Sequence, residues 1–499
     1  MAAQPTTSTP DLHVPEHPVR IVTASALFDG HDASINIMRR IMQAQGAEVV
    51  HLGHNRSVRE VVDAAIEEDV QGVAVSSYQG GHVEYFEYLV QLLRESGAGH
   101  VKVVGGGGGV IVPAEIERLR AAGVTIFSPQ DGQRLGLPGM VNQVVRACDT
   151  DLWAEHPTTA AAVLSGERAA VARAITAAET GRLDDDLRAE LERAASTRRT
   201  PVLGITGTGG SGKSSLTDEL VRRLRVDQQD KLRIACVAID PTRRRGGGAL
   251  LGDRIRMNSL DGDRVYFRSL ATRGGREVPE ALGDVLTILR AAGFDLVVVE
   301  TPGIGQGDAA ITSFADVNLY VMTPEFGAAS QLEKIDMLDF TDAVAINKFD
   351  RRGGADALRD VRRQLARERP EVPVFGTIAS RFNDDGVTAL YQAMRSALDL
   401  PPGMLAPVDT DVSTGSTVIV PPARERYLAE IAETLRGYHA ETTTRVVDAR
   451  RRQHLLTAHE VLGVDVEDHL PARDRLLDEW PAVAGAMTGQ HRASLSGTP

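Results

Sequence analysis

The sequence predicts an α/β fold made of two successive domains, each with a parallel sheet. Short apolar runs alternate with segments of helical spacing through the first 150 residues, and a similar alternation begins again near residue 200. In the second series, the apolar run Val202–Ile205 is followed by a glycine-rich turn and then by the helical segment Ser215–Leu224. Strands that alternate with helices are typical of parallel sheets, whose ligands bind beyond the carboxyl ends of the strands.

The first domain contains five strand candidates, each followed by a helix candidate. The expected strands are 19–26, 49–52, 72–76, 101–104 and 124–127, and the expected helices are 34–45, 58–67, 83–95, 113–122 and 137–147. This order predicts a flavodoxin-like sheet over residues 18–150. The loops after the strands are then expected to form its ligand edge.

Shifts in composition mark the other boundaries. Residues 1–17 are rich in Thr, Pro and Ser and are predicted to be disordered. Residues 151–199 carry two stretches rich in Ala, Glu and Arg with helical spacing, so we expect a helical linker. The second domain is expected at 200–400, and the region 401–499 is expected to hold a linker, a long helix at 424–455 and an untied tail.

The glycine-rich turn of the second domain has the spacing of a phosphate-binding loop. Two glycines, a lysine and a serine stand in the order G-x-x-x-x-G-K-S before a helix, whose free N–H groups would face an anion. We expect Lys213 to reach the β- and γ-phosphates and the Ser214 hydroxyl to ligate Mg²⁺. The alternative is an accidental glycine-rich turn. The predicted nucleotide-binding residues of this loop are Gly207, Gly209, Gly210, Ser211, Gly212, Lys213, Ser214 and Ser215.

A second nucleotide signal is Asn347-Lys348-Phe349-Asp350, which follows the apolar run 343–346. It resembles the guanine-specificity motif of G proteins, in which the aspartate accepts hydrogen bonds from the guanine N1–H and exocyclic amine. A site built on such pairs rejects the wrong base, because mismatched polar groups stay unpaired. Asn347, Lys348 and Asp350 are therefore predicted to select GTP over ATP, whereas a lone motif of this kind could also be an ordinary turn.

Between these two motifs, a β-branched strand at 296–299 ends in Glu300, with Gly303 three residues later. Most G proteins have Asp-x-x-Gly at this point. The Glu-x-x-Gly form, together with the upstream Asp240 and Asp253, resembles the G-protein metallochaperones of adenosylcobalamin-dependent acyl-CoA mutases. The resemblance implies that Asp240, Asp253 and Glu300 are Mg²⁺ or switch carboxylates and that 243–254 is a mobile switch loop.

The same resemblance implies that Lys213, Glu300 and Gln306 are catalytic. Two plainer alternatives are that Asp240 caps the end of a strand and that Asp253 pairs with a local arginine.

The first expected strand is followed by Asp29-Gly30-His31. This motif resembles the cobalamin-ligating signature of B12-dependent mutases, in which a histidine replaces the cofactor's own benzimidazole on cobalt and an aspartate orients the imidazole. The chemistry requires a neutral imidazole whose other nitrogen is held by a carboxylate. By this resemblance His31 is the cobalt ligand and Asp29 is its partner, and a solvated loop histidine is the alternative.

Two further loops match the places where that family buries the nucleotide tail of the cofactor. Ser76-Ser77-Tyr78 resembles the family's Ser-x-Leu, with Tyr in place of Leu, and the glycine run 105–109 resembles its Gly-Gly. Ser34 stands where the family usually has glycine. Ser76, Gly105 and Gly106 are the predicted tail contacts, because glycine lets the backbone approach a bulky ligand. A flexible turn is the alternative for the glycine run.

Taken together, residues 18–460 resemble the N-terminal part of the fused isobutyryl-CoA mutases, in which a B12 domain precedes a G-protein chaperone. The resemblance implies adenosylcobalamin, GTP and Mg²⁺ as cofactors, with GTP hydrolysis coupled to cofactor loading or repair. In that family a substrate-binding barrel of about 250 residues follows. Too few residues follow here, so either this sequence is a truncated part of a longer chain or an acyl-CoA-binding mutase barrel subunit, of isobutyryl-CoA or methylmalonyl-CoA type, acts in trans. An adenosyltransferase and further copies of the chain are other expected partners.

Two other classes of function remain open, a corrinoid carrier or sensor with a regulatory GTPase and a GTPase that inserts another metal. The net charge of −13 argues against nucleic acid as the main partner, and the two cysteines are too few for a disulfide framework. No apolar run approaches the roughly 20 residues that span a bilayer, and the N-terminal residues lack the basic-then-apolar pattern of a signal peptide. We therefore expect a cytoplasmic protein without a membrane partner.

Overall fold

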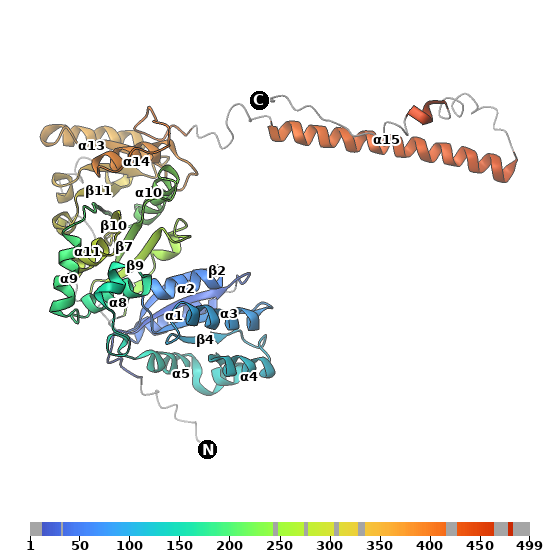
Figure 1. The fold of residues 1–499 in the computed structure, drawn as a ribbon. Coiled ribbons are helices and arrows are strands. Elements are labelled where there is room, and N and C mark those ends of the chain that lie inside the picture. The colour runs from blue at the N-terminus through green and yellow to red at the C-terminus, as the bar shows by residue number, and fades with distance from the viewer. Residues whose placement is uncertain are drawn as a thin grey trace, which may run out of the picture. The chain divides into compact units, whose positions relative to one another are not determined.

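The computed structural model describes residues 12–30, 33–242, 248–273, 278–303, 309–327, 335–415, 427–463 and 478–482. The chain divides into two compact units, residues 1–415 and residues 416–499. The first unit holds both predicted α/β domains and the predicted linker (Figure 1). The predicted disordered segment lies outside the described residues up to residue 11.

The first sheet is parallel and has the strand order β5-β4-β3-β1-β2-β8. Five of its strands are the predicted ones, and the flavodoxin-like α/β prediction is confirmed. Their bounds are β1 Arg20–Ala26, β2 Glu48–Arg56, β3 Gly72–Ser76, β4 Lys102–Gly106 and β5 Val124–Phe127. The sixth strand, β8, is only Leu250–Leu251 and comes from the second domain, where it pairs with Val49 and Val50 of β2.

Helices cover both faces of this sheet (Figure 1). One face packs against α1 and α5, and the other against α2, α3 and α4. Their bounds are α1 Ala33–Ala44, α2 Val58–Glu67, α3 His82–Glu95, α4 Pro113–Ala122 and α5 Pro129–Cys148. Helix α5 begins eight residues earlier than the expected residue 137, because Ser128 caps a first half that joins the second across a kink at Gly136, where φ is 64°.

The linker is helical, as expected, and its helices share a hydrophobic core with the second domain. The four helices are α6 Leu152–Glu155, α7 Ala160–Leu164, α8 Arg168–Glu179 and α9 Asp185–Ala195. Val171, Ile175 and Leu191 of α8 and α9 are fully or almost fully buried in one cluster with Val297 and Val299 of the second sheet. The linker therefore forms part of that domain's packing and is not a free tether.

The second sheet has seven parallel strands in the order β13-β12-β11-β6-β10-β7-β9, which fits the predicted P-loop G domain. The strands are β6 Val202–Gly207, β7 Ile234–Asp240, β9 Val265–Ala271, β10 Leu296–Glu300, β11 Val317–Met322, β12 Ala343–Asn347 and β13 Val374–Thr377. The α-helices are α10 Lys213–Asp227, α11 Leu282–Ala291, α13 Gly354–Glu368 and α14 Asp385–Ala397. Short 3₁₀ turns are η1 Arg254–Arg256, η2 Ala309–Ser313, η3 Pro324–Phe326 and η4 Asp336–Asp339.

The second unit contains the long helix α15, Tyr427–Leu462, where a helix was expected at 424–455. The first three residues of that expected helix, and the tail from 483 onward, lie outside the described residues. Across the part of the chain that the structure describes, no helix is long and apolar enough to cross a membrane.

Candidate functional site

The predicted phosphate loop lies between β6 and α10, at the carboxyl edge of the second sheet. Gly212 precedes α10 with a φ of 87°, and a Cβ there would lie 2.6 Å from Asn347 Nδ2, so a side chain would be strained. The buried Lys213 Nζ donates hydrogen bonds to Gly207 O at 2.9 Å and Thr208 O at 3.3 Å. Its ammonium group therefore lies against the backbone of the loop that would surround the phosphates.

The predicted base-reading motif lies at the end of β12 and contacts this loop directly. Asn347 Nδ2 donates to Ser211 O at 2.8 Å, and Lys348 Nζ donates to Gly210 O at 2.6 Å. Asp350 is exposed at the same edge of the sheet. The two motifs, which are far apart in the sequence, are thus held together by hydrogen bonds before any nucleotide is considered.

Carboxylates gather around the first turn of α10. The Ser214 hydroxyl lies 2.8 Å from Glu300 Oε1 and 3.1 Å from Asp253 Oδ1, and Thr217 Oγ1 donates to Glu300 Oε2 at 2.9 Å. Asp253 also pairs with Arg256 at 2.8 Å, so the plainer role suggested for Asp253 is observed. Asp253 contacts the phosphate loop and the arginine at the same time, because its Oδ1 atom lies close to both Ser214 and Arg256.

The third predicted carboxylate, Asp240, ends β7 and accepts a hydrogen bond from Gly252 N at 3.2 Å. Burial, with the charge of Asp253 adding to it, raises the pKa of Asp240 to about 8 and that of Glu300 to about 7. Hydrogen bonds from Ser214 and the charge of Lys213 oppose the rise at Glu300. A cation at this place would favour the ionised carboxylates.

These residues fit a magnesium ion held together with a nucleotide. In the described part of the chain, no three His, Cys, Asp or Glu side chains form a closed metal site. Mg²⁺ usually keeps several waters and takes one or two protein ligands plus phosphate oxygens. A serine hydroxyl and neighbouring carboxylates at a phosphate loop match that need. The predicted catalytic Gln306 and residues 243–247 of the predicted switch loop lie outside the described residues.

Those predicted cobalamin residues that the structure describes meet at the carboxyl edge of the first sheet. Asp29 is fully buried just after β1, and its Oδ2 accepts a hydrogen bond from Tyr78 N at 2.6 Å. Ser76 Oγ, at the end of β3, lies 2.9 Å from Ser25 Oγ. His31 and its neighbour Asp32 lie outside the described residues, so the cobalt ligand stays a prediction.

A cavity of about 210 Å³ opens beside these groups, between α1, α5 and the ends of β3 and β4. Ser76, Gly105 and Gly106 line it, together with apolar side chains such as those of Met38, Met42, Val104 and Met140. The glycine run is more than a flexible turn, since a Cβ on Gly105 would collide with Phe86 and one on Gly107 with Ser77 O. An apolar cavity with a glycine wall fits the nucleotide tail of cobalamin.

The junction between the two sheets is a cluster of charged side chains, most of them buried, that the sequence did not indicate. Arg254 Nη2 lies 2.7 Å from Glu67 Oε2, and Ser269 Oγ donates to Glu68 Oε1 at 2.8 Å. Nine members belong to this cluster: Arg20, Glu48, Glu67, Glu68, Arg168, Glu179, Arg254, Arg268 and Arg273. The pairing arginines hold the pKa of Glu48 and of Glu179 below the usual value in spite of burial.

The junction and the nucleotide site are contacted by consecutive residues of the sequence. Asp253 contacts Ser214 of the phosphate loop, whereas the next residue, Arg254, contacts Glu67 at the end of α2. The strand β8, just before them, extends the first sheet. The segment 250–254 therefore links the phosphate loop to the first domain without any intervening element.

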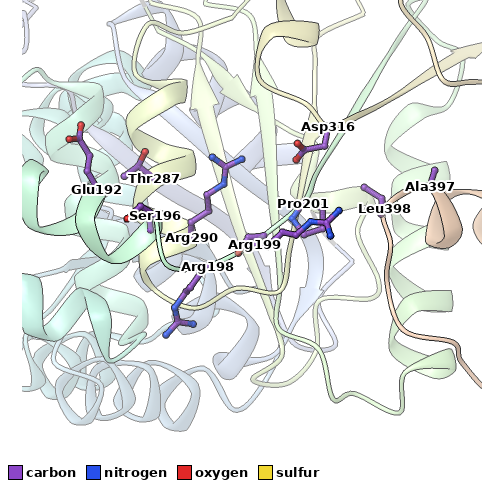
Figure 2. Close-up of a pocket in the computed structure, with 12 residues that line it drawn as sticks. Glu192, Ser196, Arg198, Arg199, Pro201, Thr287, Arg290, Asp316, Ala397 and Leu398 are labelled. Atoms are coloured by element: carbon purple, nitrogen blue, oxygen red, sulfur yellow. The ribbon is translucent and has the colours of Figure 1, made fainter.

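A larger cavity, of about 440 Å³, lies elsewhere. Figure 2 shows its lining, which includes Arg198, Arg199, Arg290 and Asp316. Pro201, directly before β6, also lines it, so this cavity is at the amino edge of the second sheet. Ligands of parallel sheets bind at the opposite edge, and we assign this cavity no part in the site.

Comparisons with known proteins agree with this geometry. Residues 19–132 match the family described as "B12 binding domain", and residues 171–400 match the family described as "Methylmalonyl Co-A mutase-associated GTPase MeaB". The chain is 64% identical to the fused isobutyryl-CoA mutase of Nocardia farcinica over 96% of this chain and 47% of the relative. The corresponding protein of Cupriavidus metallidurans is 57% identical over 95% of this chain and 46% of the relative.

The fold and the two sheet edges thus define a protein with a B12-binding domain followed by a GTPase domain of the MeaB type. Its sequence corresponds to the B12-binding and GTPase portion of the fused isobutyryl-CoA mutases, and the chain spans about half the length of those relatives.

Proposed function

We propose that this chain is the cobalamin-binding and GTPase-chaperone component of an adenosylcobalamin-dependent acyl-CoA mutase of isobutyryl-CoA or methylmalonyl-CoA type. The observation that carries the proposal is the short link between the nucleotide site and the first domain. Ser214, Asp253, Arg254 and Glu67 follow one another from the phosphate loop to the first domain. A change at the nucleotide can therefore reach the cobalamin domain through adjacent residues.

At the first sheet, His31 would hold cobalt and Asp29 would orient its imidazole. Ser76, Gly105 and Gly106 would face the nucleotide tail in the cavity beside α1 and α5. Adenosylcobalamin supplies homolytic cobalt–carbon chemistry when bound. The protein's own contribution is to hold the tail away from cobalt and to exclude water from the apolar cavity.

At the second sheet, Lys213 would offset the charge that develops on the phosphates of GTP during hydrolysis, and Mg²⁺ would bind through Ser214 with Asp253, Asp240 or Glu300 nearby. Asp350 would read guanine. Gln306 is proposed to act with Glu300 on the attacking water. Binding and hydrolysis would reorder the segment 243–254 and thereby gate the loading or repair of the cofactor.

The chain would work with a mutase barrel that binds acyl-CoA, because the upper face of the cofactor must be closed from water during radical chemistry. We further propose a cytoplasmic location, assembly of several copies and handover from an adenosyltransferase. A corrinoid carrier or sensor would use the first site but gives the GTPase no task. A GTPase that inserts another metal would need a cluster of His or Cys, and the described residues contain none.

The His31→Ala variant tests the cobalamin site. The wild-type chain should bind cobalamin with its own base displaced and an imidazole on cobalt, because Asp29, two residues before His31 in the sequence, lies with the cavity at the carboxyl edge of the first sheet. The absorption spectrum of the variant should lose the imidazole-bound signature. His54→Ala, a histidine of β2, is the control and should keep it. Identical spectra for His31→Ala and wild type would contradict the assignment.

A further inference from the structure

Two hydroxyl groups of α10 hold the carboxylate of Glu300, and the second of them lies outside the phosphate-loop motif. Ser214 Oγ lies 2.8 Å from Glu300 Oε1, and Thr217 Oγ1 lies 2.9 Å from Glu300 Oε2. All three residues are buried, and none is more than 5% exposed. Thr217 stands about one turn beyond Ser214 in the helix, so the two hydroxyls reach different oxygens of the same carboxylate.

The Thr217 hydroxyl is itself fixed in place. Its Oγ1 lies 3.0 Å from Lys213 O, four residues earlier in α10, and a threonine side chain has few rotamers in a helix. In an α-helix that carbonyl also accepts the backbone N–H four residues later, so it does not depend on the hydroxyl proton of Thr217. Thr217 therefore offers Glu300 a hydrogen-bond donor at a defined position.

The length of the Glu300 side chain gives this second hydroxyl a task. A glutamate has one more rotatable bond than an aspartate, and ordering each such bond costs conformational entropy. Held by Ser214 alone, the carboxylate could still turn about its bond to that hydroxyl. The hydrogen bond to Thr217 at the other oxygen prevents this rotation and fixes the position of both oxygens.

The resulting spacing of oxygen atoms suits a small cation. Ser214 Oγ and Glu300 Oε1 are 2.8 Å apart, close to the distance of about 2.9 Å between neighbouring oxygens of an Mg²⁺ octahedron whose Mg–O bonds are about 2.05 Å long. Around Ca²⁺, with bonds of about 2.4 Å, neighbouring oxygens in the same arrangement would be about 3.4 Å apart. A carboxylate that cannot move away from Ser214 therefore disfavours the larger ion.

We propose that Thr217 is a positioning residue that makes the nucleotide site select Mg²⁺ over larger divalent cations such as Ca²⁺. It holds the Glu300 carboxylate at the distance from Ser214 that two adjacent ligands of Mg²⁺ require. Thr217 acts through Glu300 and is not itself a ligand. This inference rests on the proposed Mg²⁺ site at Ser214 and adds the residue that sets the selectivity of that site among cations.

The test compares dissociation constants of the full chain for a fluorescent, non-hydrolysable GTP analogue in excess Mg²⁺ and in excess Ca²⁺. Wild type should bind the Mg²⁺ complex at least about tenfold more tightly. Thr217→Val and Thr217→Ala both remove the hydroxyl but differ in volume, and each should lower this preference to about threefold or less, as expected for the loss of one buried hydrogen bond. Thr217→Ser keeps the hydroxyl and should retain the wild-type preference.

Glu300→Asp gives a second, independent measurement. The shorter side chain moves the carboxylate away from Thr217, so the preference should fall as it does in Thr217→Val. Combining the two changes should lower it little further, because both break one interaction. Thr287→Val is the matched control, because the Thr287 hydroxyl makes the same kind of bond to a helix carbonyl, at 3.1 Å from Gly283 O of α11. It should keep the wild-type preference.

A purely structural role of Thr217 would weaken the binding of both cation complexes equally, so an unchanged ratio in Thr217→Val and Thr217→Ala overturns the inference. If Thr217→Val does not fold, Thr217→Ala and Glu300→Asp carry the same test. Equal binding of the two complexes by wild type also overturns the inference but leaves the nucleotide site in place. Binding of neither complex by wild type would overturn the proposed nucleotide site as well, which separates the two failures.

Discussion

The ligand-binding edges of the two sheets are lined by different kinds of side chain. At the second sheet, polar contacts dominate, and Asn347 and Lys348 are bonded to the backbone of the phosphate loop at 2.8 Å and 2.6 Å. At the first sheet, thioether and aliphatic side chains line a cavity beside the buried carboxylate of Asp29. The comparison teaches that the nucleotide edge is specified by hydrogen-bond geometry, whereas the cobalamin edge is specified by the shape of an apolar wall.

The difference extends to electrostatics. Carboxylates crowd the nucleotide edge, where burial raises the pKa of Glu300 and of Asp240. Charges at the junction are instead paired, and Arg254 lies against Glu67 with both side chains almost inaccessible to solvent. The nucleotide edge therefore holds carboxylates whose mutual repulsion a cation can relieve, while each carboxylate of the junction faces an arginine, although burial still raises the pKa of Glu67.

The largest expected effect comes from breaking the junction. Arg254→Ala leaves the buried Glu67 carboxylate with one fewer partner, and removing one partner of a buried pair typically costs about 3–5 kcal/mol. Chemical unfolding of the full chain should show a loss of that order. Arg256→Ala removes a neighbouring arginine whose side chain is 61% exposed, and it should change stability by less than about 1 kcal/mol. Equal losses in the two variants would show that the junction does not depend on the buried pair.

The next effect concerns the chemistry of the nucleotide edge. Lys213→Ala should reduce GTP turnover at least about 100-fold, because it removes the ammonium group that would offset charge in the transition state. Steady-state phosphate release measures it. Lys231→Ala, at an exposed position after α10, should keep wild-type turnover. Substantial hydrolysis by Lys213→Ala would place the catalytic charge elsewhere.

Base selection gives a further test of recognition by hydrogen bonds. Asp350→Asn should move the preference from GTP toward xanthosine triphosphate by about 100-fold or more, because the added oxo group of xanthine requires a donor where guanine requires an acceptor. Turnover of both nucleotides at subsaturating concentrations measures the ratio. Asp356→Asn, at an exposed carboxylate in the first turn of α13, is the control. If wild type already hydrolyses ATP as efficiently as GTP, the motif does not read guanine.

Local patterns were sufficient to predict much of this fold. Helix α2 begins and ends at the predicted residues 58 and 67, since Ser57 and Glu60 form a capping box before a regular apolar periodicity. Strands β1 to β5 and the phosphate loop were also predictable, because each depends on neighbouring residues in the sequence.

What could not be predicted depends on residues far apart in the chain. The two-residue strand β8 is too short for a periodic signal, and it forms only because β2 offers a free edge 200 residues earlier. Arg254 looked like part of a mobile loop, but its partner Glu67 lies on a different domain. The hydrogen bond between Ser34 and Tyr78 joins two unusual residues that the sequence could flag only one at a time.

The smallest expected effect tests the stored repulsion at the nucleotide edge. The folded-state pKa of Glu300 is raised from 4.5 to about 7, so the folded chain binds more protons than the unfolded chain between these values. The stability of the nucleotide-free chain should therefore fall as pH rises through this window, with a contribution from Glu300 on the order of 1–2 kcal/mol after allowance for its coupling to Asp253.

Glu300→Gln cannot ionise, so the difference in unfolding free energy between the variant and wild type should grow from pH 5 to pH 8 in favour of the variant. Urea unfolding at the two pH values measures it, and adding Mg²⁺ with a GTP analogue should reduce the pH dependence of wild type. A difference that stays constant between the two pH values would mean that Glu300 is already ionised at pH 5, and the contrast between a repulsive nucleotide edge and a junction of arginine–carboxylate pairs would then be wrong.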